Sequence, residues 1–448
     1  MNGTEEEAIT PIQDRSPSIS DPPPKPAKLA SIKAMFGSLS ERNYRLFASG
    51  QIVSNIGTWM QRVAQDWLVL ELSARSPMAL GIATALQFAP TLVLSAWAGI
   101  LADRMDKRKL EIVVQAGMGI PALVLGLLVV TNSAALWQVY LMCFLLGCFA
   151  AIDQPVRQSF VMEMVGKRQL PNAVALNSMT FNLARIVGPA IAGVLINLIG
   201  TGWVFLLNAG TFVAVIAGLL MMDPGKLYRG PVAPRKRGQL IEGIRYVRGK
   251  PDILIVLVLI FCVSTFAMNF QVTLANVAAN VFNRNATGYG LLTTLIAVGT
   301  LLGATLAARR SAKGIPTRRM LIGGALVFGL LEAGLTFMPT YLTFGLMLIP
   351  VGATMLTFTV TANSSVQLAA SPEMRGRVMG LYMLVFLGGN PIAGPFTGWL
   401  AEQFGGRSPF LVGGGIAVLA ALTLAVIVRT RRARATAPLD APAEVSLT

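Results

Sequence analysis

The chain has 448 residues, of which 54% are hydrophobic and 13% are charged, and its mean hydropathy is +0.62. A soluble globular chain carries about 25% charged residues, so this composition excludes a disordered protein, a nucleic-acid-binding domain and an ordinary soluble enzyme. The net charge of +16 comes from short Lys and Arg clusters between long apolar runs, a pattern typical of a polytopic membrane protein.

Both ends of the chain differ in composition from the apolar middle. Residues 1–40 contain the extended stretch Asp21–Pro26 and no apolar run that would bury a core. The lack of an apolar segment near Met1 argues against a cleavable signal peptide. We therefore expect residues 1–40 and 431–448 to be disordered cytoplasmic tails.

The middle of the chain predicts twelve transmembrane helices of about 20 residues each. The predicted spans are 46–70, 78–101, 110–131, 136–157, 173–198, 202–222, 252–276, 288–308, 318–338, 341–363, 378–400 and 409–429. The longest polar stretch between them, residues 223–250, divides the spans into six and six. We expect an N-terminal six-helix bundle over 41–222, a cytoplasmic linker over 223–250 and a C-terminal six-helix bundle over 251–430.

The distribution of basic residues predicts the orientation. Of the 37 Lys and Arg residues, 32 fall in the two tails and in every second loop, all on one side of the membrane. Three, Arg75, Arg284 and Arg407, fall on the other side, and Arg62 and Arg185 lie inside spans. Because cytoplasmic loops carry the excess of basic residues, we expect both termini and the linker to be cytoplasmic.

Three short segments of the first half recur in the second half at similar offsets. Residues 79–84 align with 288–293, residues 188–193 with 394–398, and the basic loop at 103–109 with the one at 309–319. Repeated bundles joined by a linker are typical of alternating-access transporters.

The loop after the second predicted span carries the best-matched motif, Gly99-Ile100-Leu101-Ala102-Asp103-Arg104-Met105-Asp106-Lys107-Arg108-Lys109. It resembles the signature Gly-x-Leu-Ala-Asp-Arg-x-Gly-Arg-Arg-Lys of the major facilitator superfamily, with Asp106 and Lys107 as the two departures. The resemblance covers residues 41 to about 430. It implies an all-α membrane protein of two pseudo-symmetric six-helix bundles, the major facilitator fold.

A finer resemblance is to the branch that includes bacterial siderophore and drug exporters of the enterobactin-exporter type. It is carried by Phe47-x-x-Gly50-Gln51-x-x-Ser54, Ser76-Pro77-x-Ala79-Leu80-Gly81, Gln87-Phe88-x-Pro90, Leu170-Pro171-Asn172-Ala173, Asn177 and Gly188-Pro189-Ala190. It implies a monomeric secondary transporter in the bacterial inner membrane that exports a small organic molecule, driven by proton entry.

The signature loop also implies a cytoplasmic gate that includes Gly99. In the resembled family, the acid at the position of Asp103 packs against the other bundle, and a carboxylate at a helix N-terminus is favourable. Arg104 and Arg108 are then expected to pair with Asp153 near the end of the fourth span. The alternatives are a loop that only follows the charge rule and, around Asp153, a simple helix-end turn.

The segment Gly188-Pro189-Ala190-Ile191-Ala192-Gly193 resembles the Gly-Pro motif of antiporters in this superfamily. Small residues let membrane helices approach closely, and Pro bends them. Gly188, Pro189 and Gly193 are therefore candidates for a seam that limits leakage while the bundles rock. The alternative is ordinary close packing.

Two charged residues lie deep inside predicted spans. An Arg at mid-membrane is costly unless it faces water or a partner, so Arg185 is a candidate for binding an anionic substrate group; the alternative is a structural ion pair. Burial disfavours the charged form of Glu332, which makes it a candidate proton carrier. Its place on a peripheral helix of the resembled fold favours a neutral structural acid instead.

A second pair of charges, Arg62 and Asp66, lies four residues apart in the first span, and therefore on one helix face. We expect this ion pair to face the central cavity and Asp66 to alternate between Arg62 and a proton. The alternative is a static ion pair near the outer headgroups.

Several classes of function are not favoured. The chain has no His, and Cys143, Cys148 and Cys262 all lie in apolar runs, so we expect no metal, no cofactor and no disulfide. No nucleophile with a base indicates an enzyme. Besides substrate, protons and membrane lipid, no partner is expected. The alternative function is a lysophospholipid translocase, or an importer, of the same fold.

Overall fold

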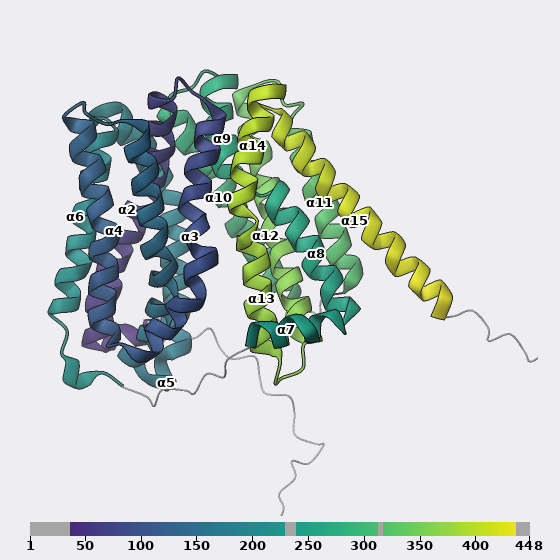
Figure 1. Cartoon of the computed structure of the whole chain (residues 1–448), viewed down its shortest axis with the longest axis horizontal. Coiled ribbons are helices and arrows are strands. Elements are labelled where there is room, and N and C mark those ends of the chain that lie inside the picture. The colour runs from purple at the N-terminus through teal and green to yellow at the C-terminus, as the bar shows by residue number, and fades with distance from the viewer. Residues whose placement is uncertain (1–35, 229–238, 312–316, 436–448) are drawn as a thin grey trace, which may run out of the picture.

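The computed structural model describes residues 36–228, 239–311 and 317–435, and within these ranges it contains helices and no strand (Figure 1). The elements of the first half, in chain order, are η1 (Gly37–Ser40), α2 (Arg42–Leu72), α3 (Pro77–Arg104), α4 (Lys107–Val130), α5 (Leu136–Ile199) and α6 (Thr201–Leu220). We use "first half" for α2–α6.

A short turn η2 (Pro224–Lys226) and a helix α7 (Gln239–Arg248) follow. The second half then consists of α8 (Pro251–Phe266), α9 (Phe270–Asn276), a π-helical turn η3 (Val277–Val281), α10 (Ala286–Ser311), α11 (Arg318–Leu335), α12 (Tyr341–Ala369), α13 (Arg375–Gly388), α14 (Asn390–Phe404) and α15 (Ser408–Ala435). We use "second half" for α8–α15.

The predicted all-α membrane fold is confirmed, although the predicted number of spans is not. Within the described residues, nine helical segments are long and apolar enough to cross a membrane. The predicted spans 136–157 and 173–198 lie on one 64-residue run, α5, which is interrupted by Gly166 at φ 67°. Helices α2 and α11 are not among these nine segments, because they contain more polar or charged residues. The number of twelve spans therefore stays a prediction.

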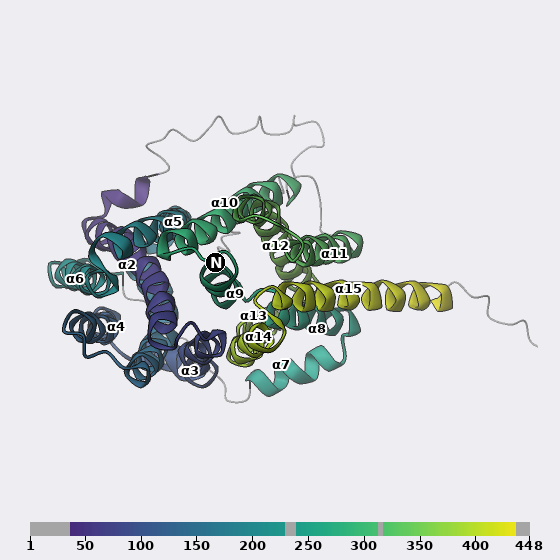
Figure 2. The same cartoon turned by 90° about the horizontal axis from the view of Figure 1, so that it is seen from above.

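The two halves lie side by side in the molecule (Figures 1 and 2). The helices of the first half form one group, α8 and α11–α15 form another, and α9 and α10 lie between them. The halves pack mainly through two helix pairs, α3 with α14 and α5 with α10. The predicted domain boundaries and linker are not tested by these contacts and stay predictions.

The ends of the helices repeat between the halves. Gly200 ends α5 at φ 84° and Gly405 ends α14 at φ 90°, so each half uses a glycine in the left-handed region just before its last helix. Ser76 caps α3 by accepting a hydrogen bond from the Ala79 amide at 3.3 Å. These turns lie at the same end of the bundle as residues 73–76. We call it the outer end, after the orientation that the basic residues predict.

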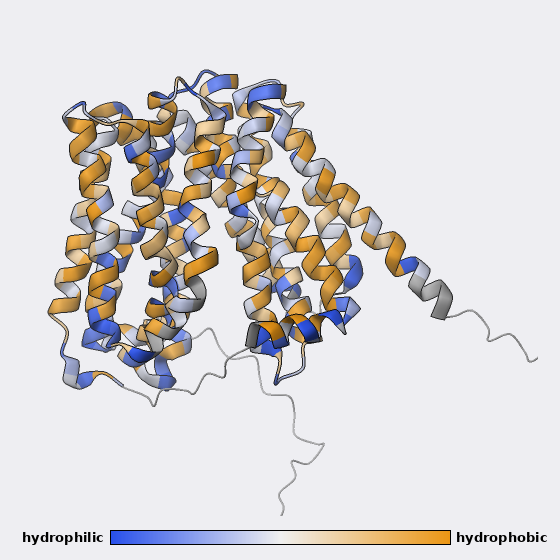
Figure 3. Ribbon diagram, in the orientation of Figure 1, coloured by the Kyte–Doolittle hydropathy of each residue, from blue (hydrophilic) through white to orange (hydrophobic). Residues whose placement is uncertain are grey.

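The outside of the helices is apolar along most of its length, and polar residues gather at the ends (Figure 3). Leu198 is 73% exposed, Trp97 68% and Phe337 71%. A soluble monomer rarely exposes large contiguous apolar patches, so this surface fits contact with lipid.

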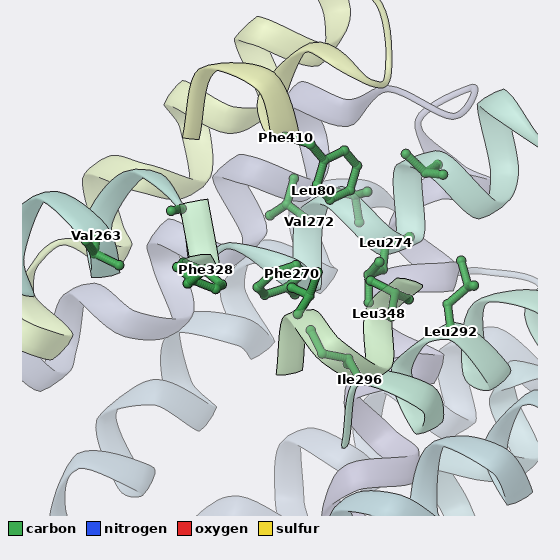
Figure 4. Close-up of a cluster of buried hydrophobic side chains, with 14 of the residues drawn as sticks. Leu80, Val263, Phe270, Val272, Leu274, Leu292, Ile296, Phe328, Leu348 and Phe410 are labelled. Carbon is green, nitrogen blue, oxygen red and sulfur yellow. The ribbon is translucent and has the colours of Figure 1, made fainter. Parts of the chain in front are cut away.

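The buried core includes residues from both halves at the outer end. Leu80 of α3 lies in one apolar cluster with Val272 of α9 and Phe410 of α15 (Figure 4). The Phe344 ring packs edge-on against Phe410, with ring centroids 5.4 Å apart. The outer end is therefore where the two halves share a core.

Helix α7 lies in the predicted linker and packs at the opposite end of the molecule against α13 (Figure 1). Glu242 forms an ion pair with Arg377 at 2.6 Å, and the Tyr246 hydroxyl accepts a hydrogen bond from the Ser371 amide at 3.2 Å. These contacts attach α7 to the second half, whereas Asp223 at the start of the predicted linker is bonded to Asn43 of the first half.

Candidate functional site

Asp66 connects the two halves. It lies on α2 and is 2% exposed. The Tyr289 hydroxyl on α10 donates a hydrogen bond to Oδ2 at 2.6 Å, and the Gln271 amide on α9 donates one to Oδ1 at 2.9 Å. We call these three residues the Asp66 latch. Both carboxylate oxygens of a first-half residue are thus held by second-half donors.

The predicted ion pair between Arg62 and Asp66 does not form, and that expectation is wrong for this structure. The Arg62 guanidinium carbon instead lies over the Trp59 ring, 4.6 Å from its centroid. Within the described residues no carboxylate lies within ion-pair distance of Arg62. Tyr289 and Gln271 each donate to one oxygen of Asp66, and the Arg62 guanidinium packs on the face of Trp59.

Arg185 also packs on Trp59. Its guanidinium carbon lies 5.7 Å from the centroid of the ring. Phe181, one turn before Arg185 on α5, meets the same indole edge-on at 5.8 Å. Trp59, Arg62 and Arg185 thus form one group, which we call the arginine–tryptophan cluster.

The Gly-Pro motif lies at close helix contacts, as the sequence predicted. A Cβ on Gly188 would lie 2.5 Å from the Cβ of Trp59, so the glycine lets α5 approach α2. A Cβ on Gly193 would lie 2.8 Å from the Cα of Thr287 on α10. A Cβ on Gly290 of α10 would lie closer still to the Pro189 carbonyl oxygen. The motif therefore serves two contacts, one inside the first half and one between the halves.

The helix pair α3 and α14 makes the matching contact on the other side of the molecule. Cβ atoms on Gly81 and Gly394 would each lie within 2.6 Å of the other residue's carbonyl oxygen. Gly398 approaches the Pro77 carbonyl in the same way. In the sequence repeat, Gly81 aligns with Gly290 and Gly394 with Gly188, so both interfaces use corresponding glycine segments.

A further contact closes the rim of the outer end. The Arg75 guanidinium donates a hydrogen bond to the Ala279 carbonyl at 3.2 Å, and the Asn280 amide donates one to the Arg75 carbonyl at 2.9 Å. Arg75 has φ 64° and Ala74 has φ 51°, values that are uncommon for residues other than glycine. Ala279 and Asn280 belong to the π-helical turn, a feature frequent at functional sites.

The predicted cytoplasmic gate is described only in part. Gly99 and Asp103 lie on α3, but the side chain of Asp103 is outside what the structure describes. The expected pairing of Arg104 and Arg108 with Asp153 is wrong: Arg104 is exposed, and Arg108 donates hydrogen bonds to the last carbonyls of α6, at 2.7 and 2.8 Å. Unpaired carbonyls at a helix C-terminus favour a cation.

Asp153 has a different set of partners. It forms an ion pair with Arg157 at 2.9 Å and accepts a hydrogen bond from Gln115 at 3.1 Å. Gln115 also donates to Glu111 at 3.0 Å, and Arg157 donates to Gln51 at 3.1 Å. This buried network joins α2, α4 and α5 within the first half.

Glu332 lies apart from these groups. It is 3% exposed on α11, where it faces α15: a Cβ on Gly413 would lie 3.2 Å from its Oε1. Its Oε2 has no hydrogen-bond partner in the described part of the molecule. The structure therefore brings Arg62, Asp66 and Arg185 to one region and leaves Glu332 inside the second half.

Sequence reasoning missed Trp59, Tyr289 and Glu111 as members of these clusters. Glu111 lies within a predicted span and was detectable as an intramembrane acid. Tyr289 has no such signal, because its role depends on a contact with Asp66, which is 223 positions away in the chain. Within the described residues, no three His, Cys, Asp or Glu side chains gather as a metal site requires.

A helical membrane protein whose two similar halves meet around buried polar residues has the architecture of a major facilitator superfamily transporter. Residues 33–445 match the family described as transmembrane secretion effector. The chain belongs to this family and is a transporter of the superfamily.

Curated relatives are identical to this chain at about a quarter of the aligned positions. The Staphyloferrin A transporter of Staphylococcus aureus is 25% identical over 295 residues, which are 65% of this chain and 73% of the relative. The Enterobactin exporter EntS of Escherichia coli is 26% identical over 349 residues, 76% of this chain and 81% of the relative.

Solved structures share the fold. An inward-facing bacterial homologue of the lysosomal transporter Spinster superposes with a TM-score of 0.66 at 16% identity, covering 89% of this chain and 96% of that one. An inward-facing bacterial homologue of the iron transporter ferroportin gives a TM-score of 0.66 at 15% identity, covering 86% and 98%. These similarities support the fold alone.

Proposed function

We propose that this transporter exports a small organic molecule of the siderophore type from the cytoplasm, in exchange for protons, with Asp66 as the proton-carrying residue. The position of Asp66 between Tyr289 and Gln271 carries the proposal, because one titratable side chain links both halves. Membership in a secretion effector family and the names of the two curated relatives support the direction and the substrate class.

The latch gives protonation a mechanical consequence. Hydrogen bonds to an ionised acceptor are roughly twice as strong as those between neutral groups. Ionised Asp66 therefore holds the outer end closed, and an empty transporter stays in that state. Protonation removes the charge and one acceptor position, and so weakens the bonds from Tyr289 and Gln271.

Exchange follows from this difference. Substrate binding from the cytoplasm supplies the free energy that separates the latch, and the outer end opens. Asp66, now exposed to the more acidic outside, takes a proton as the substrate leaves. When the halves close again, the two donors favour the ionised carboxylate, and the proton leaves to the cytoplasm.

The cytoplasmic gate and the orientation belong to the same proposal. Both termini are cytoplasmic, so the latch and the Arg75 rim lie on the outside of the membrane. Asp103 closes the cytoplasmic side against the second half. The Gly-Pro segment at 188–193 keeps the outer seam tight while the halves move.

Transport by everted membrane vesicles tests the proposal. Vesicles that contain the protein and have an acidic interior are expected to accumulate iron-free enterobactin or staphyloferrin A. These are the compounds after which the two relatives are named. Collapse of the pH gradient with a protonophore should abolish the accumulation. Net accumulation that does not depend on the gradient, or transport of lysophosphatidylcholine alone, would contradict it.

A further inference from the structure

We propose that the arginine–tryptophan cluster is a binding subsite for the anionic group of the transported molecule, and that a planar organic anion is the class of substrate it takes. The inference rests on the proposed transport function and goes further, since it assigns the substrate's charge. The observation that carries it is that two guanidinium groups lie on one indole ring, at 4.6 and 5.7 Å from its centroid.

The cluster carries two positive charges, and the carboxylate of Asp66 acts on Arg62 only through space. Neither Arg62 nor Arg185 forms an ion pair in the part of the chain that the structure describes, although both are half-buried within helices that cross the membrane. Asp66, one turn beyond Arg62, is already bound by Tyr289 and Gln271. An Arg in the membrane is costly unless it has a partner or water, and two cations on one ring also repel each other. An anion between them relieves both costs.

Close packing of α5 against α2 holds the arginine–tryptophan cluster in place. Arg185 reaches Trp59 because Gly188, three residues further along α5, has no side chain to hold the helix away from α2. Phe181 fixes the ring edge-on from the same helix at 5.8 Å. The two guanidinium groups are therefore held against an aromatic surface on rigid helices, as a preorganised site requires.

The cluster lies on the side of the first half that faces the second half. Arg62 and Asp66 share a face of α2, and Asp66 touches α9 and α10. Next to Arg185, the Ile186 carbonyl accepts a hydrogen bond from Thr294 of α10 at 3.1 Å. An anion held by the cluster thus lies close to the latch, where its charge acts on the Arg62–Asp66 region during the transport cycle.

The chemistry of the cluster selects the ligand. Guanidinium groups bind carboxylates through paired N–H donors in one plane, and aromatic rings such as indole stack with flat rings. The subsite therefore fits a molecule that joins an acidic group to a planar conjugated system. A cation of the same shape is repelled by both arginines.

Fluorescence anisotropy with two dyes of similar shape and opposite charge tests the subsite. Purified protein in detergent is expected to bind fluorescein, a planar dianion, more tightly than rhodamine 6G, a planar cation. Arg62→Gln and Arg185→Gln should each weaken fluorescein binding about tenfold or more, as loss of a charged hydrogen bond predicts. Arg62→Lys and Arg185→Lys should weaken it less, since they keep the charge.

Arg284→Gln is the matched control. Arg284 also lies over an aromatic ring, that of Tyr341 at 5.1 Å, but at the outer end of the second half. This variant should bind fluorescein as the wild type does. Equal fluorescein affinity in the wild type and in the Arg62 and Arg185 variants, or preferential binding of rhodamine 6G by the wild type, would overturn the proposal.

The same assay separates this inference from the proposed proton coupling. Asp66→Asn removes the proton carrier but leaves both arginines, so it should bind fluorescein at least as well as the wild type. If the arginine variants lose fluorescein binding while Asp66→Asn still transports with the gradient, the subsite is right and the coupling is wrong. If the arginine variants keep fluorescein binding while Asp66→Asn loses gradient-driven transport, the subsite is wrong and the coupling is right.

Discussion

The hydroxyl of Tyr289 donates a hydrogen bond to the carboxylate of Asp66 at 2.6 Å, and the two residues belong to opposite halves of the transporter. Both are almost completely buried, at 2% exposure each. A hydrogen bond to a charged acceptor contributes about 1.5–3 kcal/mol. This contact alone therefore favours the closed state of the outer end over the open state by more than a factor of about ten in population.

Tyr289→Phe removes that donor and keeps the ring. We expect the outer-open population to rise about tenfold, the ratio that about 1.4 kcal/mol produces. Double electron–electron resonance between spin labels at Asn132 and Pro339, in the outer loops of the two halves, should then show a longer distance. Tyr341→Phe is the control, because the Tyr341 hydroxyl donates to Gly288 within the second half. An identical distance distribution in Tyr289→Phe and wild type would count against the latch.

Arg75→Ala is expected to loosen the rim of the outer end with a smaller effect. It removes the side-chain bond to Ala279 but leaves the Arg75 backbone carbonyl, which still accepts from Asn280. Arg75 is exposed, so water competes for its guanidinium, and its 3.2 Å bond contributes less than the buried bond to Asp66. The distance between the same two spin labels should increase less than in Tyr289→Phe. A larger increase would show that the Arg75 rim is the main contact that closes the outer end.

Gly394→Ala should prevent full closure of the outer end. The added Cβ would lie 2.6 Å from the Gly81 carbonyl, which is backbone and cannot move aside without shifting α3. We expect normal insertion into the membrane and a severalfold loss of transport in vesicles. Gly415→Ala is the matched control, because its Cβ meets nothing within 4 Å. Equal activity of the two variants would show that the α3–α14 contact is not needed.

The proposed orientation is testable with two single cysteines in a background that lacks Cys143, Cys148 and Cys262. Asn132 and Glu373 are both exposed and lie at opposite ends of the molecule. An impermeant maleimide added outside whole cells should label a cysteine at 132 and not one at 373. Labelling of 373 alone would place the termini outside.

Sequence patterns were sufficient for the helical membrane fold and for close helix packing at 188–193, because apolar length and small-residue motifs are local properties. The role of that segment as a seam against leakage stays a prediction. The segment at 188–193 and its repeat at 394–398 do lie at close helix contacts. The partners of charged residues were not predictable in this way. Helical spacing places Arg62 on the same face as Asp66. In the structure, however, Tyr289 and Gln271 of the second half donate hydrogen bonds to the Asp66 carboxylate. Arg108 likewise donates hydrogen bonds to carbonyls at the end of α6 and does not pair with Asp153. Such choices depend on tertiary contacts between segments far apart in the chain.

The central claim is that Asp66 couples protons to transport, and Asp66→Asn in everted vesicles tests it most directly. Wild-type vesicles should accumulate iron-free enterobactin or staphyloferrin A in response to an acidic interior, and should also exchange labelled for unlabelled substrate without a gradient. We expect Asp66→Asn to keep the exchange and to lose the accumulation driven by the gradient, because asparagine cannot carry a proton. Gradient-driven accumulation by Asp66→Asn at the wild-type level would contradict the account.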